Sequence, residues 1–220
     1  MAAPQESSRQ VTSLAPLPPG ELYLAGSGSF AAEIADWAGD AGWKVLGLIE
    51  LLDLERVGGT IDGHLVVGLD PPPGGGRAVV AVGGSRSEHW ALVEGHGWTA
   101  ATVVHPMAHV SGRATLGSGC VVGPQAVIGA GTTIGAHTLA SRGALVGHHC
   151  QIGAFASLMP GANVGGHARV GDGTVVGMGA TIVNGGDVGE RATVAAGAVV
   201  LGVVADGSRV QGVPAREFQR

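Results

Sequence analysis

The chain has 220 residues, a formal net charge of −5 and 41 glycines, and only 4% of its residues are aromatic. Its length allows one large domain or two small ones, and its 45% hydrophobic content allows a substantial core. Because Lys and Arg form no cluster along the chain, we expect no nucleic-acid partner. No apolar run reaches the ~18 residues that span a bilayer, so we expect no membrane association.

The first 20 residues, MAAPQESSRQVTSLAPLPPG, are rich in Pro, Ser and Gln. They lack the basic region and the apolar region of a secretory signal peptide. This composition predicts a mobile leader over residues 1–20. The lack of a signal peptide also favours a cytoplasmic protein with reduced cysteines.

Residues 21–104 alternate between apolar runs, which predict strands, and helical spacing of small and aliphatic residues. In chain order, the expected elements are a strand at 21–26, a helix at 29–43, strands at 44–51 and 77–84, and a helix at 85–97. Either Ser85 or Ser87 is a candidate N-cap of the second helix. Strands that alternate with helices indicate a parallel sheet, so we expect a small Rossmann-like α/β subdomain over residues 21–104.

The turn between the first strand and the first helix carries a G-x-G-x-x-A pattern at Gly26, Gly28 and Ala31. Such glycines let backbone N–H groups approach a phosphate at a helix N-terminus, although a tight turn without a ligand uses the same residues. Glu50 ends the second strand, where an acid could accept a hydrogen bond from a ribose hydroxyl or a base. The candidate substrate-binding residues are Gly26, Gly28, Ser29, Phe30, Glu50 and Gly83.

From about residue 105 the chain repeats with a period of six. Sixteen consecutive hexads carry an aliphatic residue or Ala at one position, namely Val110, Leu116, Val122, Ile128, Ile134, Ala140, Val146, Ile152, Leu158, Val164, Val170, Val176, Ile182, Val188, Val194 and Val200. This period predicts a parallel β-helix in which each hexad contributes one short strand and one corner. Three hexads complete a coil, so residues 18 apart are expected to stack about 4.8 Å apart, in roughly five coils over residues 105–220.

This layout resembles the NeuD/PglD type of sugar O- and N-acetyltransferase. The resemblance covers residues 21–216 and rests on the N-terminal domain, the junction TVVHPMAHVSGRATLG, the histidine-bearing hexad in ALVGHHCQIG and the tail VQGVPAR. It implies a left-handed β-helix, a homotrimer, acetyl-CoA as the co-substrate in a groove between subunits, and a nucleotide-linked sugar held by the N-terminal domain.

The resemblance also implies roles for individual residues. His148 matches the family's general base, which takes a proton from the attacking amine or hydroxyl, and His149 stands where the family has an orienting carboxylate. Gly166 matches the donor to the oxyanion, and Ser157 replaces a second histidine near the thioester. The catalytic candidates are thus His148 and His149, and the residues matched to the cofactor groove are Ser157, Gly166, Met178, Ala196 and Arg216.

His149 and His167 are 18 residues apart, so the repeat predicts that they lie one above the other. A polar surface ladder is the favoured interpretation, with substrate contact and divalent-cation binding as alternatives, and we expect no metal cofactor. Cys120 and Cys150 fall on the small-residue position of the repeat, which favours two small buried side chains over a disulfide or a reactive thiol.

We therefore expect an acetyl-CoA-dependent acetyltransferase that acts on an amine or hydroxyl of a nucleotide-linked amino sugar, with His148 as the base. One alternative keeps the acyl-CoA and changes the acceptor, because Leu51 replaces a second acid that the family usually has after Glu50. Another is a non-catalytic trimeric scaffold, which His149 and Ser157 favour.

Overall fold

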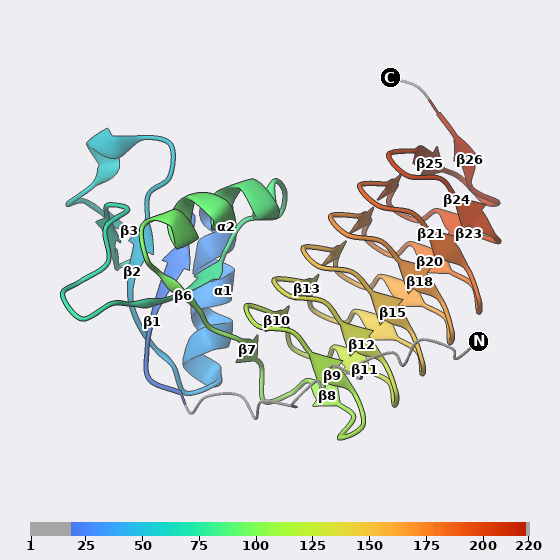
Figure 1. The fold of residues 1–220 in the computed structure, drawn as a ribbon, viewed down its shortest axis with the longest axis horizontal. Helices are drawn as coiled ribbons and strands as arrows, with labels where there is room; N and C mark the ends of the chain where they lie inside the picture. Colours follow the sequence, from blue (N-terminus) through green and yellow to red (C-terminus); the bar gives the residue numbers. More distant parts are fainter. Residues whose placement is uncertain (1–18, 219–220) are drawn as a thin grey trace, which may run out of the picture.

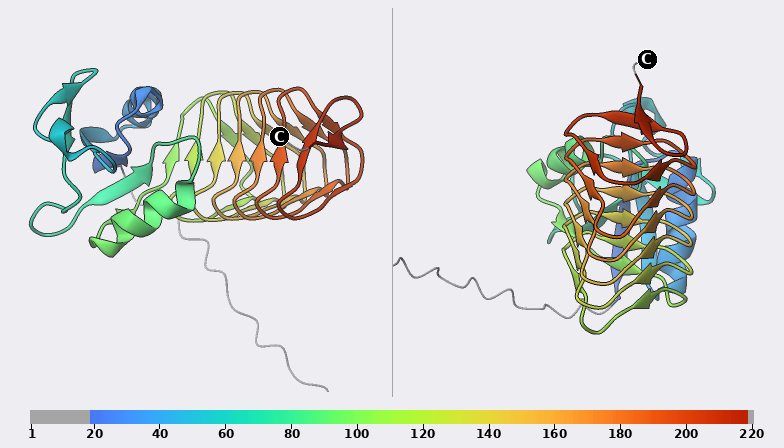
Figure 2. Two further views of the ribbon diagram at one scale, coloured as in Figure 1. Left: turned by 90° about the horizontal axis from the view of Figure 1, so that it is seen from above. Right: turned by 90° about the vertical axis from the view of Figure 1, so that its right-hand side faces the viewer.

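The computed structural model describes residues 19–218, so most of the leader predicted for residues 1–20 lies outside the described residues. The described chain forms an N-terminal α/β unit beside a β-helix (Figure 1). The coils of the β-helix follow one another along a single axis that leads away from the N-terminal unit (Figure 2).

The N-terminal unit is built on a six-stranded sheet with the order β3-β4-β2-β1-β5-β6. Its elements are β1 (Glu21–Ala25), α1 (Ser29–Asp40), β2 (Lys44–Ile49), the 3-10 helix η1 (Leu54–Arg56), β3 (Thr60–Ile61), β4 (His64–Val67), β5 (Arg77–Val80), α2 (Arg86–Gly95) and β6 (Thr99–Ala100). Neighbouring strands are parallel except β3 and β4. The three strands and two helices expected from the sequence are present with slightly shorter bounds, Ser85 is the N-cap residue of α2, and β3, β4 and β6 were not predicted.

The two helices cover opposite faces of this sheet because successive side chains of a strand point to opposite sides. Leu22 and Leu24 of β1 pack with Ile34 and Trp37 of α1. On the other face, the cluster that contains Trp90 of α2 also contains Ala25, Ile49 and Val80. The sheet is therefore buried on both sides, and the ends of its strands are left for loops.

The β-helix has three faces, each a stack of short strands. Face 1 consists of β7 (Val103–Val104), β10 (Val121–Val122), β13 (Leu139–Ala140), β16 (Ser157–Leu158), β19 (Val175–Val176), β22 (Thr193–Val194), β25 (Arg209–Gln211) and β26 (Arg216–Glu217). Face 2 consists of β8 (His109–Val110), β11 (Val127–Ile128), β14 (Leu145–Val146), β17 (Asn163–Val164), β20 (Thr181–Ile182) and β23 (Val199–Val200). Face 3 consists of β9 (Thr115–Leu116), β12 (Thr133–Ile134), β15 (Gln151–Ile152), β18 (Arg169–Val170), β21 (Asp187–Val188) and β24 (Val203–Val204).

The sixteen aliphatic positions of the repeat all lie in the core of the β-helix or pack against it. Strands pair in parallel with a step of 18 residues, as when Val127 pairs with Leu145. The stack is longer than predicted, because Val103–Val104 already pair with β10, before the expected boundary at residue 105. Past the sixteenth hexad, within the predicted range, the stack continues through β24, where Asp187 pairs with Val203 and the coil is two residues shorter, and through β25, where Thr193 pairs with Arg209.

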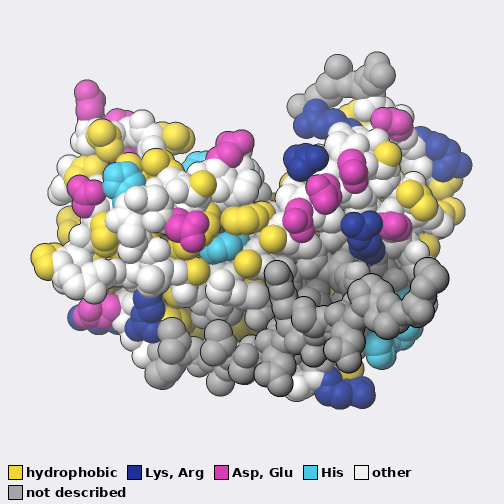
Figure 3. Space-filling model, viewed as in Figure 1, with side chains coloured by type: hydrophobic (Ala, Val, Ile, Leu, Met, Phe, Trp, Pro, Cys, Tyr) yellow, Lys and Arg dark blue, Asp and Glu magenta, His cyan; other side chains and the backbone are white. Residues whose placement is uncertain are grey.

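The N-terminal unit packs onto the first coils of face 1. Val103, Val121 and Leu139 point outward from face 1 and belong to the same buried cluster as α1. The guanidinium of Arg86, at the start of α2, donates to the backbone carbonyl of His137 at the corner between faces 3 and 1. The later coils extend past the N-terminal unit, and Figure 3 shows the resulting open notch between the two parts of the molecule.

Candidate active site

The three histidines of the candidate site occupy one corner of the β-helix, the corner between faces 2 and 3. His148 and His149 follow β14, and His167 follows β17 one coil further on. His149 and His167 both have positive φ, 55° and 57°, so successive coils project these side chains in the same direction. The predicted stacking is confirmed, because the rings of His149 and His167 lie 5.1 Å apart with an interplanar angle of 9°.

His148 lies across this stacked pair. Its ring centroid is 5.3 Å from that of His149 and 4.9 Å from that of His167, with edge-on geometry in both cases. Nδ1 of His148 is 3.1 Å from Nδ1 of His149, which is hydrogen-bond distance. One of these two nitrogens must carry the proton and the other must accept it.

Gly166 lies directly beside the His148 ring. A Cβ atom on Gly166 would be only 2.8 Å from Nε2 of His148, so only glycine leaves this position of the imidazole undisturbed. The N–H of Gly166, predicted as the oxyanion donor, already donates to Oδ1 of Asn184 at 3.0 Å. Asn184 was not predicted, although it stands 18 residues after Gly166 in the same corner and the repeat could have identified it.

The remaining cofactor candidates lie elsewhere on the β-helix. Ser157 is buried on face 1, and Arg216 is exposed on β26. Met178 and Ala196 stack at the corner between faces 1 and 2, where the N–H of Gly197 donates to the carbonyl of Met178. A single chain therefore brings Gly166 to His148 and brings Met178 to Ala196, but it does not bring these two pairs together.

The glycine turn of the N-terminal unit lies at the carboxyl ends of two adjacent parallel strands. Gly26 follows β1 and Gly83 comes shortly after β5, and these strands pair directly. Gly26 has a φ of +123°, and a Cβ there would be 2.6 Å from the side chain of Val82. Gly28 is the N-cap residue of α1, and Ser29 and Phe30 form the first turn of that helix. The turn, the helix N-terminus and Gly83 thus lie at one edge of the sheet, the carboxyl ends of β1 and β5, where parallel sheets usually bind ligands in a crevice. We call this edge the crevice.

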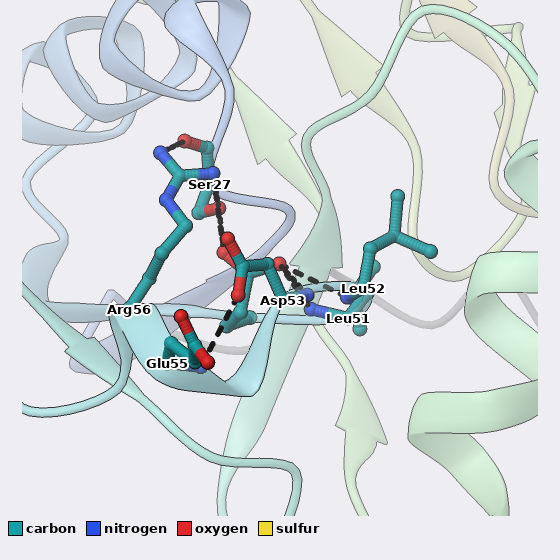
Figure 4. Close-up of polar contacts among 7 residues, drawn as sticks. Ser27, Leu51, Leu52, Asp53, Glu55 and Arg56 are labelled. Atoms are coloured by element: carbon teal, nitrogen blue, oxygen red, sulfur yellow. Dashed lines mark hydrogen bonds and ion pairs between the residues drawn. The ribbon is translucent and has the colours of Figure 1, made fainter.

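Glu50, the residue after β2, has a structural role, and its partners Ser27, Leu51, Leu52, Asp53 and Arg56 are labelled in Figure 4. One carboxylate oxygen accepts a hydrogen bond from Ser27 Oγ and lies 3.3 Å from the guanidinium of Arg56. The other accepts the backbone N–H groups of Leu51, Leu52 and Asp53 at 3.0–3.1 Å. The contact of Glu50 with a ribose hydroxyl or a base stays a prediction, and such a ligand would have to share oxygens that these five groups already contact.

The environment of Glu50 also affects its protonation. Burial by itself would raise the pKa of the carboxyl, but the hydrogen bonds from Ser27 and from the backbone of Leu52, Asp53 and Leu51 outweigh burial and lower the pKa. The group therefore remains a carboxylate at neutral pH and holds the loop after β2 in place.

Both cysteines are buried and free, as expected. Burial raises the pKa of the Cys120 thiol to about 11 and raises the pKa of Cys150 as well. Their thiols lie close to the backbone carbonyls of Gly135 and Gly165, at 3.2 and 3.1 Å. Protonated, buried thiols are poor nucleophiles, so the chemistry of the site has to come from other residues.

The histidine corner and the N-terminal unit lie on opposite sides of the β-helix. In a triangular coil, the corner between faces 2 and 3 is opposite face 1. Face 1 carries the chain's own N-terminal unit, and Figure 1 shows β7, β10 and β13 on the side of α1 and α2. The crevice at Gly26 and the imidazole of His148 therefore do not meet within one chain.

Comparison with solved structures identifies the class of protein. The acetyltransferase domain of PglB from Neisseria gonorrhoeae FA1090, solved alone and in complex with acetyl coenzyme A, is 30% and 29% identical, with a TM-score of 0.82 in both cases. The alignments cover 90% of this chain and 99% and 98% of those chains. PerB from Caulobacter crescentus, in complex with CoA and GDP-perosamine, is 26% identical with a TM-score of 0.70, over 93% of this chain and all of the other. WeeI from Acinetobacter baumannii AYE, at 24% identity and a TM-score of 0.79, shares the fold.

No family model matches the sequence, and no curated protein sequence matches it. The structural relatives nevertheless define the family: the chain belongs to the NeuD/PglD-type sugar acetyltransferases with a left-handed β-helix. It is an acyltransferase, and acetyl-CoA is its co-substrate. This assignment sets aside the alternative of a non-catalytic scaffold. In the part of the chain that the structure describes, no helix is long and apolar enough to cross a membrane.

Proposed function

We propose that this protein transfers the acetyl group of acetyl-CoA to an amine, or a hydroxyl, of a nucleotide-linked amino sugar, with His148 as the general base. The observation that carries the proposal is the position of the His148 ring. Its Nδ1 is engaged by His149, and its Nε2 faces the space beside Gly166 at the exposed corner. A base needs one free ring nitrogen and a fixed orientation, and this arrangement provides both.

His149 takes over the orienting role for which the family uses a carboxylate. If Nδ1 of His148 donates its proton to Nδ1 of His149, Nε2 of His148 carries the free lone pair. A neutral imidazole accepts this hydrogen bond as a carboxylate would. It does not offset the positive charge that His148 gains when it takes the proton, so we expect a slower reaction than a carboxylate at residue 149 would support.

The reaction is a direct transfer. The acceptor nitrogen, or the oxygen of an acceptor hydroxyl, attacks the thioester carbon as Nε2 of His148 removes its proton, and the oxyanion forms on the carbonyl oxygen. Collapse of this intermediate breaks the C–S bond, and the CoA sulfur leaves as the thiol after it gains a proton. The acetyl group is then bound to the acceptor as an amide or ester.

Asn184 is the donor that we assign to the oxyanion. Because the Gly166 N–H can only donate, the atom 3.0 Å away must be the amide oxygen of Asn184, and its NH₂ group points elsewhere. Asn184 is exposed and reaches back over Gly165, since a Cβ on Gly165 would be 2.5 Å from the same oxygen. Its NH₂ group is therefore available on the same corner as the base.

The acceptor nucleotide is assigned to the crevice of the N-terminal unit. The N-terminus of α1 at Gly28 favours a phosphate, and Arg56 supplies a positive charge beside Ser27, whose carbonyl it contacts at 3.3 Å. This assignment is consistent with the nucleotide sugar GDP-perosamine that is bound in the PerB structure. Arg56 takes the place of Glu50 as the proposed ligand contact in this crevice.

A homotrimer would unite the two halves of the site. Within one chain, the histidine corner is opposite the face that carries the crevice, so a neighbouring copy has to supply the crevice or the rest of the cofactor groove. Face 2, which borders this corner, points two apolar side chains into solvent, Val127 with 36% and Leu145 with 43% of its surface exposed. We propose that face 2 is the contact between copies.

The experiment that tests the function measures the thiol released from acetyl-CoA with a panel of acceptors. The panel contains UDP- and GDP-linked amino sugars, the corresponding free amino sugars and simple primary amines. We expect thiol release only with a nucleotide-linked sugar, and mass spectrometry should show one added acetyl group on it. Release with a free amine and none with any nucleotide sugar would contradict the proposed acceptor class.

A second candidate keeps the acyl transfer and changes the acceptor. Two observations favour this second candidate. The carboxylate of Glu50 already accepts hydrogen bonds within the chain, and Leu51 stands where the family usually has a second acid, so the crevice has no free acid at this edge. The same panel distinguishes it, because an acceptor of another class would show acetylation without a nucleotide.

A further inference from the structure

We propose that His148, His149 and His167 together bind a divalent transition-metal ion, with Zn²⁺ as the representative ion. Three of the chain's nine histidines lie at this one corner, and each is exposed. A nitrogen atom of each ring lies within 4.8 Å of a nitrogen of the other two. No metal cofactor was expected from the sequence, where cation binding was only an alternative for His149 and His167.

The spacing of the nitrogens suits one metal ion. Zn–N bonds of about 2.0–2.1 Å place two ligand nitrogens about 2.9 Å apart at an octahedral angle and about 3.3 Å apart at a tetrahedral angle. The Nδ1 atoms of His148 and His149 are 3.1 Å apart, between these values. The His167 ring has to turn out of its stacked position on His149 to bring one of its nitrogens into the same coordination sphere.

The chemistry of the donors selects the type of ion. Imidazole nitrogens suit Zn²⁺, Ni²⁺, Co²⁺ and Cu²⁺, whereas Mg²⁺ and Ca²⁺ prefer oxygen ligands. The three side chains are exposed in the single chain, so water or a small anion can complete the coordination of the ion. We therefore expect discrimination between these two groups of cations.

The backbone positions the three histidines before any ion binds. His149 and His167 are fixed in the same left-handed conformation, and the N–H of His167 donates to the carbonyl of His148 at 2.9 Å. The N–H of His149 donates to the carbonyl of Ala130 one coil below, also at 2.9 Å. Binding thus requires side-chain rotation and no rearrangement of the chain.

Metal binding has a consequence for the reaction, which rests on the proposed function. A metal held by both Nδ1 atoms requires a lone pair on each, so the remaining proton of His148 moves to Nε2. In that tautomer Nε2 cannot take a proton from the acceptor. We therefore expect the ion to act as an inhibitor, by occupying the base.

The test is calorimetric titration of the full chain with Zn²⁺, repeated with Co²⁺ and Mg²⁺. We expect saturable binding of one Zn²⁺ per chain, a visible absorption band with Co²⁺, and no binding of Mg²⁺. His167→Asn should weaken Zn²⁺ binding at least about tenfold, because Asn tolerates the positive φ but removes one ligand. His109→Asn, an exposed histidine outside the cluster, is the matched control and should bind as the wild type does.

A lack of saturable Zn²⁺ binding, or unchanged binding by His167→Asn, would overturn the metal site. Inhibition of acetyl transfer by Zn²⁺, measured relative to the activity of each protein without metal, should weaken in His167→Asn in parallel with Zn²⁺ binding. A third outcome is that the wild type binds Zn²⁺, that His167→Asn does not, and that Zn²⁺ does not inhibit acetyl transfer by the wild type. This outcome would support the metal site and argue against His148 as the base. The two proposals can therefore fail separately.

Discussion

At the scale of single residues, Gly166 is the position on which the geometry of His148, the proposed base, depends. The absence of a side chain lets the His148 ring lie against the backbone of the next coil, and Asn184 approaches the same glycine. The backbone conformation of Gly166 does not require glycine. A larger residue at this position would therefore change activity through its contact with the His148 ring and not through backbone strain.

Gly166→Ala is expected to lower kcat at least about tenfold and leave the fold intact. The added methyl would be 2.8 Å from Nε2 of His148, so the imidazole has to move away from the acceptor. Gly112→Ala is the matched control, because Gly112 is in the same corner and a Cβ there meets no atom within 4 Å. Steady-state kinetics of both variants test this, and a wild-type kcat in Gly166→Ala would mean that Nε2 does no chemistry in this position.

His137 is a buried histidine that stays neutral. It is stacked on Phe155 at 4.8 Å and packs against Trp90 at 4.4 Å, at the junction between the N-terminal unit and the β-helix. Burial and the nearby Arg86 guanidinium lower the pKa of His137 to about 4. Its folded pKa is thus below the ordinary value of 6.5, and the unfolded chain binds the proton more readily between these two values.

The free energy of unfolding is therefore expected to fall as the pH falls from 6.5 to 4, by roughly 3 kcal/mol from this residue. Above pH 6.5 the contribution of neutral His137 is fully present. His137→Asn, which tolerates the φ of 57°, should remove this part of the pH dependence. Urea unfolding at several pH values measures it, and an unchanged slope in His137→Asn would show that other groups cause the acid sensitivity.

At the scale of elements, the loop after β2 depends on one carboxylate. Glu50 joins β2 to Ser27, to the N–H groups that lead into η1, and to Arg56 within η1. A segment with so few apolar contacts is held mainly by these hydrogen bonds, since Leu52 and Leu54 are largely exposed. The contribution of the Glu50 carboxylate to the free energy of unfolding should be fully present above pH 4.5, the ordinary pKa of the group. It should be lost as the pH falls through the lower pKa that Glu50 has in the folded protein.

Glu50→Ala is expected to destabilise the protein by about 3 kcal/mol, because it leaves the donors and the Arg56 charge without their acceptor. The loop after β2 should also become sensitive to limited proteolysis. Glu55→Ala, an exposed neighbour in the same loop, should change the free energy of unfolding by no more than about 0.5 kcal/mol. If Glu50→Ala were as stable and as protease-resistant as the wild type, Glu50 would not be the anchor of this loop.

The elements that the sequence predicted share a strong local signal. The hexads place an aliphatic residue at every sixth position, and every one of these positions lies in or against the core, because each coil buries one such side chain per face. The pair β3 and β4 has only two and four residues, and their partly exposed side chains show no clear alternation. The role of Glu50 depends on hydrogen bonds from a loop that has no regular pattern, so spacing alone suggested a ligand contact instead.

The site was predicted in part for the same reason. The repeat predicted the stacking of His149 on His167, since both lie at one position of consecutive coils. The repeat did not predict that Asn184 would accept a hydrogen bond from the N–H of Gly166, because this contact depends on the conformation of the Asn184 side chain. It also did not show that the candidate residues divide between two corners and one face of the β-helix.

At the scale of the whole molecule, the proposed assignment of the acceptor to the crevice and of the base to the histidine corner implies that a second copy takes part in catalysis. We expect a trimer of about 65 kDa, three times the 21.7 kDa of the chain, by light scattering. Leu145→Asp on face 2 should dissociate it and abolish turnover, because a charge replaces an apolar contact. Gln151→Asp on face 3, at the same position of the next hexad, should remain trimeric. An active monomer would contradict the shared site.

The most direct test of the account is the turnover of His148→Ala with acetyl-CoA and the acceptor found in the panel. We expect a loss of kcat by a factor of about 10²–10⁴, with unchanged affinity for CoA and an unchanged oligomeric state. Such a result would separate the chemical step from binding and from folding. A variant that retained wild-type turnover would show that His148 is not the base, and the proposed mechanism would be wrong.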